Sequence, residues 1–130
     1  MSRYLQLHSG PVAFLLGVDC IQEVGAVGDI PDSSGLRLWR DKQIRVWNMP
    51  RLFGFSGPCT HQVVVQENSR LVILDVDQIA GLMTIEENRF QPFSPVTAEA
   101  SRYFDHALPL PDGRCLLRLR RPLGWLDDGL

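Results

Sequence analysis

The sequence predicts an all-β fold, a barrel or a sandwich, on three observations. Short runs of β-branched or alternating residues recur along the chain, separated by Gly, Pro, Asp or Asn. Their spacing is nearly regular, as in barrels and sandwiches built from short strands. No segment has the pattern of a long amphipathic helix, and the best helical candidate covers only residues 97–103, with Thr97 as its N-cap.

The individual strands follow from the turn residues at their ends and from the period of their side chains. Ile44 and Val46 share one face of a strand, and Arg45 and Trp47 share the other. Residues 63–65 and 71–74 are apolar on both faces, which indicates strands that are enclosed on both sides, joined by a hairpin loop at residues 67–70. We predict ten strands, at residues 4–8, 12–16, 20–24, 36–40, 44–49, 62–67, 70–75, 82–85, 104–108 and 115–119.

Length and composition predict one globular domain covering residues 1–130. The chain is long enough to bury a core, and its 45% apolar and 22% charged residues are typical of a soluble protein. A net charge of −2 favours neither nucleic acid nor an anionic membrane. Charged or turn residues interrupt every apolar run before it could span a bilayer, and the N-terminus does not resemble a signal peptide. We therefore expect a cytoplasmic protein without membrane insertion.

The cysteines give no sign of a disulfide framework or a metal site. Cys20, Cys59 and Cys115 are widely spaced, no CxxC pair occurs, and no histidine stands at ligand spacing from a cysteine. Scattered cysteines of odd number are typical of reduced, buried thiols. We expect no disulfide, no metal and no cofactor.

Candidate catalytic groups are equally sparse. Asp75 and Asp77 are two residues apart and could resemble a metal or acid–base pair, but they lack a nearby histidine or third carboxylate, and solvation at a strand end is the better interpretation. Ser56, Cys59 and His61 are close in sequence without the context of a hydrolase or a cysteine protease. No glycine-rich phosphate loop is present. We expect no enzymatic activity.

Three segments, taken together, resemble one known family. Residues 38–54, LWRDKQIRVWNMPRLFG, resemble the signature segment of CheW-like domains. Residues 17–24 are similar to the early strand of that family, which ends in a glutamate followed by an apolar residue, and residues 71–82 resemble its later block of an apolar run, Val-Asp and a glycine. The turn at residues 112–114 into an apolar strand also fits, so the resemblance covers the chain from about Tyr4 to Leu119.

The sequence departs from the family pattern at several signature positions. Leu38, Asp41, Arg45 and Asn48 stand where the family favours Asn, Gly, Pro and Asp. The connection between Glu23 and Arg40 is also several residues shorter than usual. The chain therefore resembles a divergent, shortened member.

The resemblance implies two small five-stranded β-barrels, of the SH3-like kind, packed around a shared hydrophobic core and without catalysis. Such domains couple chemoreceptors to the histidine kinase CheA, whose regulatory domain has the same fold. The expected partners are the helical cytoplasmic tip of a chemoreceptor and the regulatory domain of a CheA-like kinase. The expected function is that of an adaptor in chemotaxis signalling.

By resemblance, Arg40, Ile21 and Glu23 are the candidate receptor-binding residues. Arg40 falls at the family's signature arginine, and its five N–H donors suit carboxylates or carbonyls of a partner helix. The alternative is a structural arginine that bridges the two barrels. Ile21 and Glu23 lie two apart on one strand and are expected to share a face, with Ile21 toward the receptor groove. The alternative for Ile21 is an ordinary core residue beside a solvated glutamate.

A second function class comes from the charge of residues 37–51. Five basic residues and Asp41 give this segment a charge of +4, so the rest of the chain carries −6. The basic residues are Arg37, Arg40, Lys42, Arg45 and Arg51, with Trp39 and Trp47 between them. A basic, aromatic β-surface is also how single-stranded nucleic acid is bound, and this remains the alternative function. In an acidic chain such a patch is more often a protein interface, with Trp39, Arg45 and Trp47 as further candidates, or plain solvated surface than a nucleic-acid site.

Overall fold

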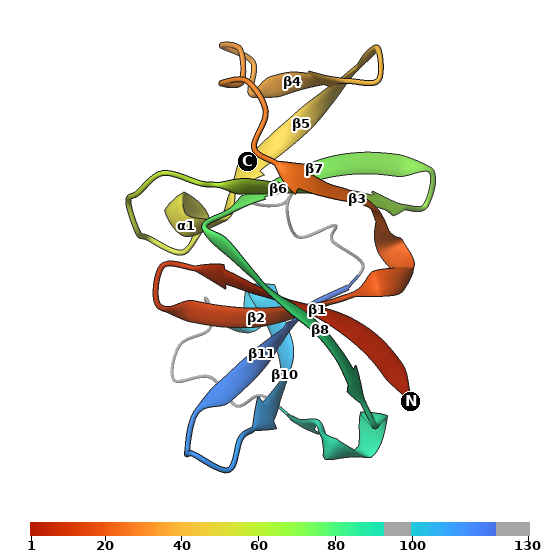
Figure 1. The fold of residues 1–130 in the computed structure, drawn as a ribbon, viewed down its shortest axis with the longest axis vertical. Helices are drawn as coiled ribbons and strands as arrows, with labels where there is room; N and C mark the ends of the chain where they lie inside the picture. Colours follow the sequence, from red (N-terminus) through yellow and green to blue (C-terminus); the bar gives the residue numbers. More distant parts are fainter. Residues whose placement is uncertain (93–99, 122–130) are drawn as a thin grey trace.

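The computed structural model describes residues 1–92 and 100–121 and confirms the predicted all-β fold. The strands form two sheets, one above the other in Figure 1. Two short α-helices, α1 (Met49–Leu52) and α2 (Ala100–Tyr103), and two short 3-10 helices, η1 (Val18–Cys20) and η2 (Glu87–Arg89), lie between strands, and of these only η1 connects one sheet to the other. The described part of the predicted 97–103 helix is helical from Ala100, and residues 97–99 lie outside the described residues.

The first sheet holds both ends of the described chain. Its strands, in spatial order, are β8 (Gln78–Ile85), β1 (Ser2–Ser9), β2 (Val12–Gly17), β11 (Cys115–Leu119), β10 (Phe104–Pro109) and β9 (Gln91–Pro92). Neighbouring strands are antiparallel except β11 and β2, which are parallel. The sheet thus has the five expected strands and the two-residue β9, which the sequence pattern missed because Pro92 is a weak strand residue.

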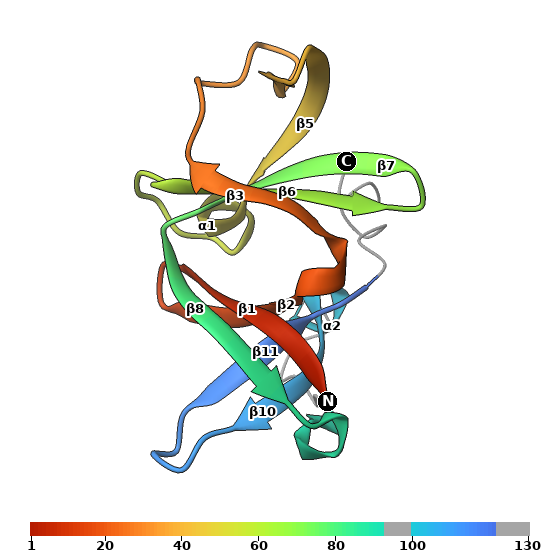
Figure 2. The ribbon, with the colours of Figure 1, turned by 45° about the vertical axis from the view of Figure 1, so that its right-hand side comes forward.

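The second sheet is formed by the middle of the chain. Its order is β3 (Ile21–Ala26), β6 (His61–Glu67), β7 (Arg70–Val76), β5 (Lys42–Asn48) and β4 (Leu36–Trp39). After β7 the chain returns to the first sheet along β8, as Figure 2 shows. We call the first sheet with its loops the first subdomain, and the second sheet with its loops the second subdomain.

A shared hydrophobic core lies between the two sheets, as expected. It combines buried side chains of the first sheet, such as Leu7 and Phe14, with side chains of the second, such as Val63 and Leu74. Each subdomain also has a small core of its own, centred on Leu15 and Leu108 in the first and on Ile44, Val64 and Ile73 in the second. The fold is therefore three stacked apolar layers separated by two sheets.

This layering explains the strands that are apolar on both faces. Along β6, Val63 and Val65 face the shared core, whereas Val64 faces the core of the second subdomain. Successive residues of a strand point to opposite faces, so a strand between two cores must be apolar throughout. β7 follows the same rule, with Leu74 on the shared core and Ile73 on the other.

Most strand boundaries differ from the predicted ones by one or more residues, and two of the differences, at the start of β8 and the end of β3, show why. β8 begins at Gln78 instead of residue 82, because Gln78 and Ile79 pair with β1 across a bulge at Gln6 and Leu7. β3 continues to Ala26 instead of residue 24, because Gly25 and Ala26 pair with Gln62 and His61. Both extensions contain glycine or alanine, which are weak strand formers, and pairing to a neighbouring strand overrides that local preference.

Candidate functional site

The β4–β5 hairpin carries most of the candidate residues and stands at the end of the molecule away from the first sheet (Figure 1). Trp39 pairs with Lys42, so the turn has two central residues, Arg40 and Asp41. Both have positive φ, 47° and 64°, as a type I′ turn requires. The tight turn places the Arg40 side chain at an exposed tip.

Arg40 and Glu23, two of the residues singled out from the sequence, form an ion pair. Arg40 Nη2 donates to Glu23 Oε2 at 2.7 Å, and the side chains are 69% and 38% exposed. The guanidinium also lies 4.6 Å from the centroid of the Trp39 ring, in a cation–π contact. Glu23 belongs to β3 in the same subdomain, so in this contact Arg40 does not bridge the two barrels.

Ile21 and Glu23 do not share a face, contrary to the expectation from their spacing. The register of β3 on β6 shifts between them, so Ile21 pairs with Val65 and Glu23 with the adjacent Val64. A β-bulge adds one residue to one strand and thereby reverses the alternation beyond it. Ile21 packs against the shared core and is half-buried, whereas Glu23 reaches Arg40 on the opposite side.

Arg45 and Trp47 lie on the same face of β5, as the alternation predicts. The guanidinium of Arg45 is 5.7 Å from the centroid of the Trp47 ring. Trp47 packs against the shared core, and its Nε1–H is buried without an acceptor among the described residues. Trp39, on β4, packs instead against the core of the second subdomain.

A buried ion pair that the sequence did not indicate lies behind this hairpin. Arg37 on β4 and Asp75 on β7 form a two-pronged contact, Nη1 to Oδ1 at 2.7 Å and Nη2 to Oδ2 at 3.0 Å. The side chains are only 4% and 7% exposed. Arg37 also donates to Gln62 Oε1 at 3.1 Å and to the backbone oxygen of Asp29. The sequence suggested that Asp75 is solvated at a strand end, and this interpretation is wrong because its side chain is buried and paired.

The sequence held a weak signal for this pair. Arg37 alternates with Leu36 and Leu38 and shares a face with Trp39, and Asp75 ends an unbroken apolar run. Neither feature names the partner, which lies 38 residues away. Asp77, the other carboxylate of the suspected pair, accepts from the backbone N–H of Gly10 at 2.6 Å and so anchors the β1–β2 turn.

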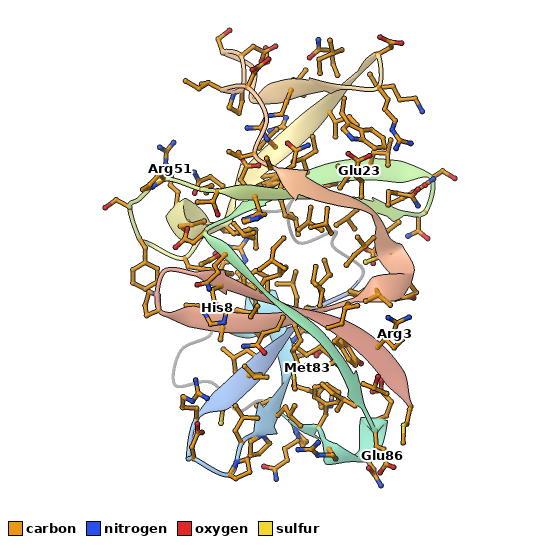
Figure 3. The ribbon with its side chains drawn as sticks, viewed as in Figure 1. Arg3, His8, Glu23, Arg51, Met83 and Glu86 are labelled. Atoms are coloured by element: carbon orange, nitrogen blue, oxygen red, sulfur yellow. The ribbon has the colours of Figure 1, made fainter. Side chains whose placement is uncertain are left out.

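The basic segment of residues 37–51 is less positive at the surface than its composition suggests. Arg37 is buried and paired with Asp75, and Arg40 is paired with Glu23. Glu23 and Arg51, both labelled in Figure 3, lie on opposite sides of the second subdomain. A continuous basic face for a nucleic-acid backbone is thus divided, which weakens the alternative function.

A cleft of about 870 Å³ opens beside the Arg37–Asp75 pair. Its wall is formed by the loop of residues 27–35, the end of β5 with α1, and residues 57–59. Cys59 lines it, and burial raises the pKa of this thiol to about 11, so the thiol is protonated at neutral pH. His61 Nδ1 contacts Thr60 Oγ1 at 2.7 Å. Neither Cys59 nor His61 is arranged as an activated nucleophile and its base.

The cysteines and carboxylates of the described residues form no metal cluster. Cys20 is buried, Cys59 half-buried and Cys115 exposed, and all three are free thiols. The prediction that all three are buried is wrong for Cys115, whose side chain lies at the start of β11 next to the β10–β11 turn. No group of three or more His, Cys, Asp or Glu side chains within residues 1–92 and 100–121 is placed to hold a metal ion.

No helix within the described ranges is long and apolar enough to cross a membrane. The candidate residues lie on β3 and on the β4–β5 hairpin, and Arg40 in the exposed turn is bonded to Glu23 on β3.

Comparison with known proteins gives the family. The chain belongs to the CheW-like domain family, whose sequence profile matches residues 3–122. It is similar in structure to the scaffolding protein TtCheW from Thermoanaerobacter tengcongensis, with a TM-score of 0.76 and 18% sequence identity over 92% of this chain and 88% of that chain. No curated protein matches the sequence. CheW-like scaffold proteins are non-catalytic adaptors, and membership implies a role in chemotaxis coupling.

Proposed function

We propose that this domain couples a chemoreceptor to a CheA-type histidine kinase in the cytoplasm, with the Arg40–Glu23 surface facing the receptor. The family match over residues 3–122 supports the coupling role. The observation that carries the assignment of the surface is the exposure of Arg40 at the hairpin tip, at the position of the family's signature arginine.

The chemistry of Arg40 suits a partner helix. Among the described residues its one hydrogen bond goes to Glu23, and a guanidinium has five N–H donors, so most of its donors face solvent. A partner's carboxylate or helix-terminal carbonyl groups would accept from these donors. Glu23 and the Trp39 ring both contact the guanidinium and favour its present orientation, which reduces the side-chain entropy lost on binding.

Binding measurements with two separate partners test the proposal. Isothermal titration calorimetry of this protein with the regulatory domain of a CheA-type kinase, and with a soluble helical receptor tip, should give saturable binding in both cases. Failure to bind either partner contradicts the coupling role.

Reversal of one charge then tests the receptor surface. Arg40→Glu should weaken binding to the receptor tip by about 2–5 kcal/mol if the arginine is desolvated in the complex. Its effect on unfolding should stay within about 1 kcal/mol, since the pair with Glu23 is solvent-exposed. Arg114→Glu is a matched control, because Arg114 forms a similarly exposed pair with Asp112 in the first subdomain. Unchanged receptor affinity with a lowered melting temperature would make Arg40 a structural residue.

A further inference from the structure

The β4–β5 hairpin is attached to the sheet along only half of its length. β4 pairs with β5 and with no other described strand. β5 pairs with β7 only through Val46–Asn48, whereas its pairing with β4 involves residues 42–45. The end that carries Arg40 therefore projects beyond the hydrogen-bonded sheet, as Figure 1 shows. Backbone pairing alone leaves this end free to swing.

The exposed contact between Arg40 and Glu23 is a weak means of fixing the hairpin. Both side chains reach water, so solvent screens their attraction and competes for their hydrogen bonds. Ile44 and Trp39 pack against the small core of the second subdomain and resist separation of the hairpin from the sheet. Apolar contact is not directional, so it leaves the orientation of the hairpin less defined.

Arg37 supplies the directional contact. Its planar guanidinium is held by both oxygens of Asp75 on β7, by Gln62 on β6, and by the backbone oxygen of Asp29 in the loop before β4. These acceptors belong to three separate parts of the second subdomain. A planar fork bound on several sides tolerates little rotation.

The loop of residues 27–35 closes over this side chain. Gly28 donates its backbone N–H to Gln62 Oε1 at 3.0 Å, the same oxygen that accepts from Arg37. A Cβ atom at Gly28 would lie 2.8 Å from Cδ of Arg37, so the approach of this loop requires a glycine. The result is a desolvated pair, 4% and 7% exposed, inside a closed set of polar contacts.

We propose that the Arg37–Asp75 pair is a positioning element, which orients the β4–β5 hairpin so that Arg40 meets its partner in one geometry. The proposal rests on the proposed role of Arg40 in receptor binding. Arg37 and Asp75 touch no partner and act through the hairpin. The pair joins β4 to β7 at the base of the hairpin, because Asp75 pairs with Asn48 at the end of the β5–β7 ladder farther from the turn, whereas β5 leaves the sheet beyond the pairing of Val46 with Ile73.

The experiment removes both charges together, so that neither is left buried alone. In Arg37→Met/Asp75→Leu, apolar side chains of similar length replace the pair, and we expect the protein to remain folded. Three quantities are measured: the melting temperature, the affinities for the receptor tip and for the kinase regulatory domain, and the hydrogen-exchange rates of the amides of residues 37–45. Arg114→Met/Asp112→Leu, which removes the exposed pair at the β10–β11 turn, is the matched control.

The expected result separates positioning from stability. The hairpin amides should exchange faster and the receptor tip should bind several-fold more weakly, while the affinity for the kinase domain stays as in the unaltered protein. The control variant should change none of these. Unaltered exchange together with unaltered receptor affinity overturns the positioning role and leaves the coupling role intact.

Two further outcomes keep the two proposals distinct. If the unaltered protein does not bind the receptor tip, the assignment of the receptor surface fails, and the positioning proposal falls with it. If the double variant does not fold, Arg37→Lys replaces it, because lysine keeps the charge and loses the fork. Faster hairpin exchange with weaker receptor binding in Arg37→Lys supports the proposal, and wild-type values for both overturn it.

Discussion

The side chain of Arg37 is desolvated, and protein acceptors bind nearly all of its N–H donors. Such a buried pair adds little net stability relative to a well-packed apolar pair, because desolvation offsets the attraction. Its loss on one side only is costly, since the remaining charge stays buried without a partner. Arg37 donates four hydrogen bonds, two of them to Asp75. Replacing Arg37 alone therefore leaves the Asp75 carboxylate buried without its partner.

This asymmetry gives a prediction for unfolding. Arg37→Met alone should lower the free energy of unfolding by about 3–5 kcal/mol. Adding Asp75→Leu should restore most of that loss. Urea denaturation of the two single variants and the double variant measures the coupling, and additive losses would contradict a mutually dependent buried pair.

The three cysteines differ in reactivity for a physical reason. Burial raises the pKa of Cys20 and of Cys59 to about 11. The nucleophile is the thiolate, and at pH 8 only about one thiol in a thousand is ionised at such a pKa. Cys115 is exposed. The accessible position should therefore react with an aromatic disulfide reagent well before the other two.

Labelling as a function of pH checks this difference. Between pH 7 and 10 the labelling rates of Cys20 and Cys59 should rise about tenfold per pH unit, since each step multiplies the thiolate fraction by that factor. Cys115→Ala identifies the fast site, and the same reagent applied in denaturant supplies the reference rates. Equal rates for all three thiols of the folded protein at pH 8 would contradict the burial of Cys20 and Cys59.

At the scale of the element, both tight hairpins of the second sheet use left-handed residues that are not glycine. Arg40 and Asp41 form one turn, with φ of 47° and 64°. Asn68 and Ser69 form the other, with φ of 51° and 66°. Type I′ turns favour glycine at the second central position, and the family favours glycine at the position of Asp41. The β4–β5 turn is therefore formed at some cost in backbone energy.

Substitution by glycine should relieve that cost. Asp41→Gly should raise the free energy of unfolding by about 1 kcal/mol, the order of the left-handed penalty. Ser69→Gly, at the equivalent position of the β6–β7 turn, is the matched control and should act in the same direction. Thermal unfolding measures both, and a lowered melting temperature for Asp41→Gly would show that the aspartate has a contact that outweighs its strain.

At the scale of the whole molecule, the shared core couples the two subdomains. Phe14 of the first sheet is fully buried and lies 5.7 Å from the ring centroid of Phe53 and 6.4 Å from that of Phe104. Arg121 adds a polar link, with contacts to Asp19 beside the first sheet and to Glu67 on β6. Neither sheet can keep its inner face buried when the other unfolds. We propose that the described subdomains unfold as one unit.

Removal of one core ring tests this coupling. Phe14→Ala should cost about 3–5 kcal/mol and should lower a single transition rather than split it. Far-ultraviolet circular dichroism follows both sheets, while the fluorescence of Trp39 and Trp47, recorded in a Trp125→Phe background, follows the second subdomain. Leu82→Ala, at a position that is 57% exposed, is the control and should change stability by less than about 0.5 kcal/mol. Two separate transitions would indicate independent subdomains.

The sequence by itself determined the strand content, the family, and the burial of the middle strands on both of their faces. These features are local: a period of two, an apolar run, or a turn residue shows in a few consecutive positions, as in residues 63–65. The sequence placed Arg40 at the end of a strand covering residues 36–40, and in the structure the strand ends at Trp39 and Arg40 lies in the two-residue turn. The sequence did not identify the residues that Arg40 meets.

Only the tertiary structure decided which side chains meet. The Arg37–Asp75 pair joins residues that are 38 positions apart in the sequence. The bulge between Ile21 and Glu23 places these two residues on opposite faces of the sheet, although they are two positions apart. Both depend on which strand lies next to which and in what register. Pairing of that kind is set by the burial of whole faces against the shared core, and no short stretch of sequence carries that information.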